Sequence, residues 1–128
     1  MKEVINTSLA PAAFGPYSQA IRIGSRLYIS GQIGADPDSG LLPEDFSAQA
    51  HQVMKNLEAI LTEAGFNFAG VVKSTIFLAD LADFTMLNEI YGSYFSGRRP
   101  ARSCIQVAGL PKGAKVEIEL IAEKNPAA

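Results

Sequence analysis

The sequence is short of several residue types that would point to particular chemistries. It has no tryptophan, one cysteine (Cys104) and one histidine (His51) among its 128 residues. One cysteine cannot form an internal disulfide, and one cysteine with one histidine gives no zinc-ligand spacing. We therefore expect a protein of a reducing compartment, the cytoplasm, without a metal site.

Long apolar runs and a strong charge of one sign are also absent. No run of about twenty apolar residues occurs, so we expect no segment that spans a membrane. Residues 1–11 lack the apolar core of a signal peptide. The formal net charge of −2 makes a nucleic-acid partner unlikely on electrostatic grounds. The glycine-containing stretches lack the strand–loop–helix context of a phosphate-binding loop, so we expect no cofactor.

What remains is typical of one globular domain covering residues 1–128. Hydrophobic residues make up 48% of the chain and charged residues 19%, and the length is sufficient for a real core. The apolar share is slightly high for so small a domain. This surplus hints that part of the surface is covered by further copies of the chain.

Hydrophobic periodicity predicts an α+β fold with a mixed sheet of about six strands. Asp45 is a good N-cap for a first helix that ends before Gly65, and Asp83 precedes a second helix. The element order is β-β-β-α-β-α-β-β, with both helices on one face of the sheet. The other face has no helix to cover it, so we expect neighbouring subunits there. The expected strands cover residues 2–5, 19–23, 26–33, 71–79 and the two arms of 100–123; the helices cover 45–64 and 84–95.

Residues 100–123 read as two alternating strands joined by a turn at Pro111 and Lys112. If these two arms form a hairpin, their alternation places several polar side chains on one face of the sheet. The side chains expected on this face are Arg102, Cys104, Gln106, Glu117 and Glu119. Such a cluster is either a solvated surface or a functional site.

Arg102 is the informative member of this cluster, because an arginine in mid-strand is costly unless its donors meet an anion. One interpretation is an internal ion pair with Glu117 or Glu119. The other is a bidentate clamp for a carboxylate ligand, with a nearby glutamate orienting or deprotonating a water. Nucleophilic catalysis by Cys104 is not favoured, because His51 is expected on a solvated helix surface.

Gly31 lies inside an otherwise apolar strand. A glycine in mid-strand often marks a β-bulge, or a place where a ligand or another backbone comes close.

Five segments occur in a familiar order: GPYSQA (15–20), ISGQI (29–33), LNEIYGSYF (87–95), PARSC (100–104) and LPKGAKVEIELIA (110–122). Together they resemble the reactive intermediate deaminases, the Rid or YjgF family, over nearly the whole chain. PARS followed by a VEIE strand is the specific part of the signal. Within the family, the chain is most similar to the RidA branch.

The resemblance implies a chorismate-mutase-like fold and a homotrimer with active sites in clefts between subunits. It also implies hydrolysis of enamine and imine intermediates, such as 2-iminobutanoate and 2-iminopropanoate, to 2-oxo acids and ammonia. These intermediates arise from pyridoxal-phosphate-dependent serine and threonine dehydratases. The implied partner is thus a small imine or 2-oxo acid that carries a carboxylate.

The same resemblance assigns roles to individual residues. Arg102 would bind the substrate carboxylate, and Glu117 would position or activate the attacking water. The remaining substrate-binding positions would be Tyr17, Ser30, Gly31, Asn88 and the backbone carbonyl of Cys104. A short loop at residues 97–99 and Gln106, which stands where an acidic residue is common, would alter the rim of the cleft and the substrate range.

Two other classes of function stay open. The family has been linked to translation inhibition and endoribonuclease activity, and a basic rim could form from Arg98, Arg99, Lys112 and Lys115. Against it stand the net negative charge and the lack of a histidine pair. The second of these classes is a ligand-binding or chaperone-like trimer that uses the cleft for binding only.

Overall fold

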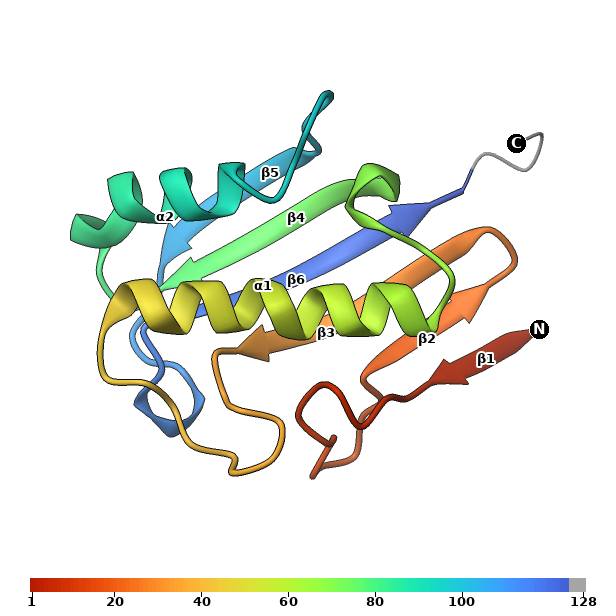
Figure 1. Ribbon diagram of the computed structural model, residues 1–128, viewed down its shortest axis with the longest axis horizontal. Helices are drawn as coiled ribbons and strands as arrows, with labels where there is room; N and C mark the ends of the chain where they lie inside the picture. Colours follow the sequence, from red (N-terminus) through yellow and green to blue (C-terminus); the bar gives the residue numbers. More distant parts are fainter. Residues whose placement is uncertain (125–128) are drawn as a thin grey trace.

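The computed structural model describes residues 1–124 and contains the predicted elements in the predicted order (Figure 1). The second helix stops earlier than periodicity indicated, at Gly92, and residues 93–95 form a turn. The strands are β1 (Lys2–Ile5), β2 (Ala20–Ile23), β3 (Arg26–Ile33), β4 (Val71–Leu78), β5 (Ala101–Gln106) and β6 (Val116–Glu123), and the helices are α1 (Phe46–Glu63) and α2 (Phe84–Gly92).

The six strands form one mixed sheet in the order β1-β2-β3-β6-β4-β5. All neighbouring strands are antiparallel except β4 and β5, which are parallel and are connected through α2. The predicted hairpin of β5 and β6 is therefore wrong, because β4 lies between them. Residues 107–115 are long enough to pass beyond β4, and alternation within each strand carries no information about its neighbour.

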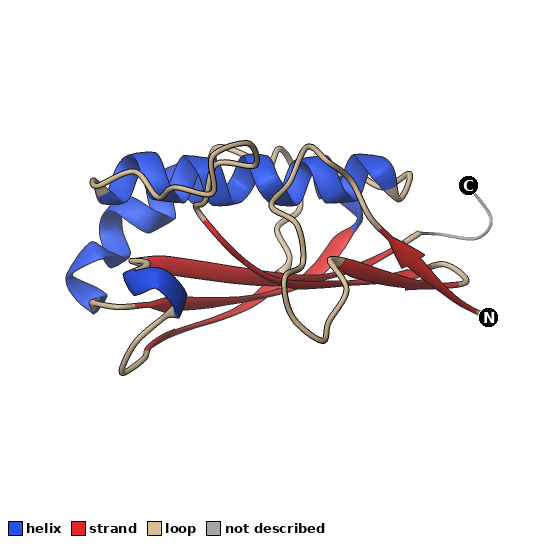
Figure 2. Cartoon of the chain, turned by 90° about the horizontal axis from the view of Figure 1, so that it is seen from below, coloured by secondary structure: helices blue, strands red, loops and turns tan. Residues whose placement is uncertain are grey.

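Both helices cover the same face of the sheet, as predicted (Figure 2). The Asp45 carboxylate caps α1 by accepting a hydrogen bond from the Ala48 N–H at 2.6 Å, which satisfies one of the free N–H groups of the first turn. The apolar stripe of α1, represented by Leu57 and Ile60, is fully buried. It packs in one core with inward-facing sheet residues such as Ile118. Neither helix of residues 1–124 combines the length and hydropathy that crossing a bilayer needs.

The face of the sheet that no helix covers (Figure 2) carries several apolar side chains that are exposed in a single chain. Their positions follow from the pairing of the strands, since directly paired residues share a face. Large, partly or fully exposed side chains on this face include Val4, Ile23, Tyr28 and Ile105. Such a surface is suited to contact with another protein.

Candidate active site

Arg102 and Glu117 lie on opposite faces of the sheet. Arg102 pairs with Ser74 of β4, which faces the helices and bonds to the Tyr91 hydroxyl at 2.7 Å. Glu117 pairs with Phe77 of the same strand, which faces the other way. The prediction that Arg102, Cys104 and Gln106 share a face with Glu117 and Glu119 is therefore wrong. That prediction assumed that β5 and β6 pair directly. In the structure both strands pair with β4, and this pairing places the even-numbered residues of β5 on the face opposite Glu117 and Glu119.

The Arg102 guanidinium is held by residues of α2. Its Nη1 donates a hydrogen bond to Asn88 Oδ1 at 2.7 Å. Its central carbon lies 5.5 Å from the ring centre of Phe84 and 5.4 Å from that of Tyr91, within the range of cation–π attraction. Within residues 1–124 no carboxylate pairs with it, so the interpretation as an internal ion pair is wrong.

This guanidinium borders a shallow hollow of about 350 Å³ beside the edge strand β5. Its polar lining residues include Asn88, Arg99 and Arg102. Since Asn88 occupies only one of the five N–H donors of Arg102, the others remain available to an anion. We call Asn88 and Arg102 the arginine half-site.

Glu117 is a half-buried carboxylate without a side-chain hydrogen bond to any of residues 1–124. Burial raises its pKa above the ordinary value, and the negative charge of Glu119 raises that pKa further. A carboxylate that is partly dry and unpaired is a good candidate for proton transfer.

Gly31 makes room for this carboxylate. A β-carbon at this position would overlap the carboxylate of Glu117, so glycine leaves this side chain free to occupy its present position. Gly31 also lies at the register shift between Ile29 and Gln32, where β3 bulges against β6. The prediction of a bulge at this glycine is confirmed.

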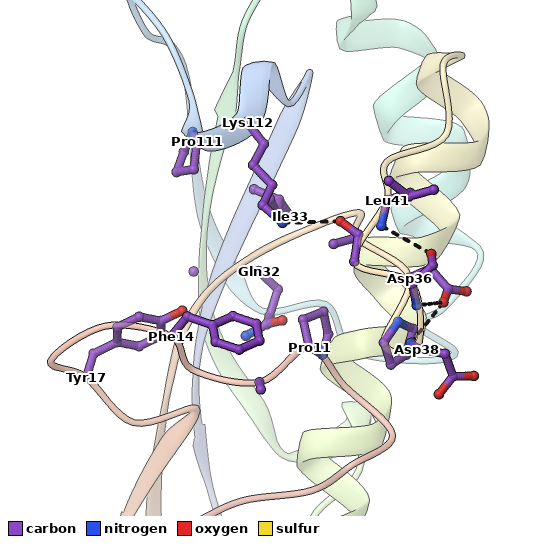
Figure 3. Close-up of a pocket in the computed structure, with 16 residues that line it drawn as sticks. Pro11, Phe14, Tyr17, Gln32, Ile33, Asp36, Asp38, Leu41, Pro111 and Lys112 are labelled. Atoms are coloured by element: carbon purple, nitrogen blue, oxygen red, sulfur yellow. Dashed lines mark hydrogen bonds between the residues drawn. The ribbon is translucent and has the colours of Figure 1, made fainter.

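A larger cavity of about 520 Å³ opens beside Gly31 (Figure 3). Its lining comes from the loop at residues 11–17, from the end of β3 with the loop that follows it, and from the turn at Pro111 and Lys112. Tyr17 belongs to this lining (Figure 3), and it is 55% exposed. We call Tyr17, Gly31 and Glu117 the carboxylate half-site.

Ser30 precedes Gly31 in β3 and is not among the residues that line the cavity. Its hydroxyl donates a hydrogen bond to the Ser18 carbonyl at 2.6 Å, and its N–H donates to the Gln19 carbonyl at 2.9 Å. Ser30 thus fixes the segment that carries Tyr17 and positions it against β3.

Gln19 is a positioning residue that the sequence analysis missed. Its buried side-chain oxygen accepts a hydrogen bond from the Thr7 N–H at 2.8 Å. Its amide nitrogen donates to the carbonyls of Thr7 at 3.1 Å and Pro11 at 2.8 Å. These bonds hold the irregular loop before Tyr17. The one available signal was a polar residue at the start of an apolar strand.

Cys104 and His51 are not brought together for catalysis. Cys104 is half-buried on the helix-covered face, paired with Ile76, and burial raises the pKa of its thiol. His51 is exposed on α1, as predicted, with its Nδ1 3.0 Å from the Tyr94 hydroxyl. The thiol therefore stays protonated and weakly nucleophilic. Among residues 1–124, no three His, Cys, Asp or Glu side chains converge as metal ligands.

One chain therefore carries two half-sites: Tyr17, Gly31 and Glu117 on one side, and Asn88 and Arg102 on the other. The first offers a carboxylate with a raised pKa beside a cavity. The second offers a fixed guanidinium with free donors. Together they supply the two groups that hydrolysis of a carboxylate-bearing substrate requires.

The chain is similar to known proteins over nearly its whole length. A family model described as Endoribonuclease L-PSP matches residues 7–124. The chain is 53% identical to a mouse protein named 2-iminobutanoate/2-iminopropanoate deaminase, over 98% of this chain and 94% of the mouse protein.

Solved structures agree with this match. RidA from the Antarctic bacterium Psychrobacter superposes with a TM-score of 0.93 at 49% identity, covering 95% of this chain and 99% of that protein. TdcF from E. coli, solved with bound serine, gives a TM-score of 0.93 at 42% identity, covering 96% of this chain and 99% of that one. The sequence match over residues 7–124, the strand order and these superpositions establish that the chain belongs to the Endoribonuclease L-PSP family, also called the YjgF or Rid family.

Proposed function

We propose that this protein hydrolyses reactive enamine and imine intermediates, such as 2-iminobutanoate and 2-iminopropanoate, to 2-oxo acids and ammonia. The observation that carries the proposal is the pair of complementary half-sites, one with a guanidinium open to an anion and one with an unpaired carboxylate. The name of the mouse relative, at 53% identity, supports the same reaction.

In the proposed reaction, Arg102 holds the substrate carboxylate through two parallel hydrogen bonds, which the planar fork of arginine suits better than lysine. Asn88, Phe84 and Tyr91 keep the guanidinium in place. The serine bound to the related TdcF also bears a carboxylate, which agrees with an anion-binding arginine in this family.

Glu117 acts on water in this proposal. Its carboxylate takes a proton from a water molecule as the oxygen attacks the imine carbon, and passes that proton to the imine nitrogen, so that a carbinolamine forms. Glu117 then transfers the proton of the new hydroxyl group to the nitrogen, the carbon–nitrogen bond breaks, and ammonia leaves as the carbon–oxygen double bond forms. Tyr17, Gly31 and the backbone carbonyl of Cys104 complete the proposed substrate contacts, while Ser30 positions Tyr17.

We further propose that the protein is a homotrimer in which each site joins Arg102 of one subunit with Glu117 of its neighbour. Two observations support this assembly. The two residues lie on opposite faces of one sheet, and the helix-free face exposes apolar side chains such as Tyr28 and Ile105.

The cytoplasm is the proposed compartment. Cys104 is a free thiol, which suits a reducing compartment.

Cleavage of RNA by a histidine pair is not available to a chain whose one histidine, His51, lies beside Tyr94.

The test is a coupled assay in which a threonine or serine dehydratase generates the imine. Semicarbazide traps the imine that survives, with and without this protein. We expect faster imine decay and faster release of the 2-oxo acid and ammonia when the protein is present. Decay at the buffer rate, together with binding of 2-oxobutanoate in calorimetry, would instead identify a ligand-binding trimer.

A further inference from the structure

We propose that the cavity beside Glu117 receives the side chain of the substrate, and that imines with bulky apolar side chains are therefore the better substrates. The inference rests on the proposed deaminase function. It concerns imines derived from amino acids such as leucine and phenylalanine, whose side chains exceed the methyl and ethyl groups of 2-iminopropanoate and 2-iminobutanoate.

Two lining residues of the cavity are neighbours of Glu117. Gly31 lies directly against the carboxylate of Glu117 and also lines the cavity. Ile33 pairs with Glu117 across β3 and β6, so its side chain lies on the same face, and it lines the cavity as well. We therefore place the imine carbon near Glu117 and the substrate side chain past Gly31 and Ile33, in the cavity.

The cavity is too large for the smallest imines. Its volume of about 520 Å³ lies within the range of pockets that hold drug-sized ligands, roughly 300–1,000 Å³. A methyl or ethyl side chain would leave most of this space to water. A branched or aromatic side chain would displace that water and gain apolar contact.

The lining facing this space is largely apolar (Figure 3). Phe14 is 89% exposed and Leu41 is 70% exposed, so both large apolar side chains stand in water in the single chain. Tyr17 adds a third large side chain beside Phe14 (Figure 3). Prolines complete the wall, at positions Pro11, Pro37 and Pro111.

Of the three charged side chains in the lining, those of Asp36 and Lys112 have partners within the chain, whereas the Asp38 carboxylate forms no hydrogen bond or ion pair within residues 1–124. The Asp36 carboxylate accepts hydrogen bonds from the N–H groups of Asp38 and Ser39, both at 2.9 Å, and these bonds lower its pKa. Lys112 Nζ donates to the Gly40 carbonyl at 3.2 Å and ties the turn to the loop after β3. These contacts do not favour a charged substrate side chain.

Gln32 is the polar exception. It is buried, it lines the cavity, and no side-chain hydrogen bond to it occurs within residues 1–124. An amide in this position could receive a polar substrate side chain instead. A glutamine-derived imine, which is close in size to that of methionine, therefore belongs in the test.

The test compares kcat/KM for a series of imines that an amino acid oxidase generates in place, with semicarbazide as the competing trap. We expect the imines of leucine and phenylalanine to exceed that of alanine by about tenfold, the scale on which apolar pockets discriminate. Leu41→Asp should lower this ratio about tenfold, because it places a charge in the apolar wall. Phe14→Ala should lower it in the same direction.

Leu9→Asp is the matched control, because Leu9 is 71% exposed and lines a separate hollow against α1. It should leave every rate unchanged. A ratio near one, or a ratio that Leu41→Asp and Phe14→Ala do not alter, would overturn the side-chain cavity and leave the deaminase function standing. Faster turnover of the glutamine imine than of the methionine imine would overturn the apolar preference. Acceleration of no imine would overturn the proposed function itself.

Discussion

Arg102 and Glu117 face opposite sides of one sheet, although the strands that carry them, β5 and β6, both flank β4. A substrate held by the Arg102 of one chain is thus on the helix-covered side of that chain's sheet, and its Glu117 is on the other side. We therefore expect catalysis to require groups from two subunits.

Mixing two inactive variants tests this expectation directly. Arg102→Ala and Glu117→Gln homotrimers should each be nearly inactive. Unfolding and refolding the two together in equal amounts should restore about a quarter of wild-type activity, because a quarter of random seams receive both intact residues. Light scattering should give about three times the chain mass of 13.7 kDa. Mixed samples without recovered activity, or a fully active monomer, would contradict shared sites.

If the arginine half-site binds the substrate carboxylate, Arg102→Ala should lose most of its activity. A charge-assisted contact contributes roughly 1.5–3 kcal/mol, so kcat/KM should fall about tenfold to a hundredfold. Arg102→Lys should recover little, because an ammonium cannot bond to Asn88 and to a carboxylate in the geometry of the planar fork. Arg98→Ala, which removes an exposed loop arginine, is the control. Full activity in Arg102→Ala would end the deaminase proposal.

The raised pKa of Glu117 predicts the acid limb of the pH profile. If Glu117 takes a proton from water, kcat/KM should fall as pH drops through its raised pKa. Glu119→Gln removes the neighbouring negative charge, lowers the pKa of Glu117 and should move this limb to lower pH. Glu117→Gln should still bind 2-oxobutanoate in calorimetry and lose hydrolysis.

The raised pKa of Glu117 also predicts how the free energy of unfolding changes with pH. A raised folded-state pKa means that protonated Glu117 favours the fold, and this contribution is lost as pH rises through that pKa. Glu117→Gln should therefore be at least as stable as the wild type at neutral pH, with the difference vanishing in acid. Urea denaturation at both pH values measures it. Destabilisation at neutral pH would indicate a partner for Glu117 that residues 1–124 do not supply.

Substitution of Gly31, in β3, and of Gly34, directly after it, should have different effects on stability and activity. At Gly34 an alanine β-carbon would overlap the backbone of Gln49 on α1, which cannot move alone, so Gly34→Ala should cost about 1–3 kcal/mol of stability. At Gly31 the overlap is with the Glu117 side chain, which can rotate away. Gly31→Ala should thus fold with little loss and lower kcat. Thermal unfolding and kinetics of both variants distinguish the two effects. Equal losses of stability in the two variants would contradict this prediction.

Cys104→Ser should keep most of the activity. Burial raises the pKa of the thiol, and His51 lies beside Tyr94 rather than beside Cys104. The proposed contact uses the backbone carbonyl of Cys104, which serine retains. Kinetics of the variant, with and without iodoacetamide treatment of the wild type, provide the measurement. An inactive Cys104→Ser would revive nucleophilic catalysis.

The sequence predicted the elements well because periodicity and caps are local. Asp45 and the apolar stripe of α1 lie where the pattern indicated. Strand pairing is not local: β5 and β6 each alternate correctly, but the pattern could not reveal that β4 lies between them. The faces of Arg102 and Glu117 were misassigned for that reason alone.

The resemblance named the residues of the candidate site, but not the hydrogen bonds that hold them in place. The resemblance named Ser30 as part of the pocket, but it did not indicate that its hydroxyl donates a hydrogen bond to the Ser18 carbonyl. Gln19 was missed, because a buried amide bonded to Thr7 and Pro11 carries no pattern that a sequence alone exposes. Cavity shape depends on such contacts between distant segments.

The central place of β6 also bears on how the chain folds. Tyr28 pairs with Ile121, and Thr75 pairs with Glu119, so the middle of the sheet joins segments far apart along the chain. Such non-local pairing slows folding, because the chain loses the entropy of loop closure before the stabilising contacts form. A nascent chain on the ribosome that has emerged only as far as β5 holds two unjoined parts, β1-β2-β3 and β4-β5. Each exposes an unpaired edge that chaperones could shield until β6 arrives.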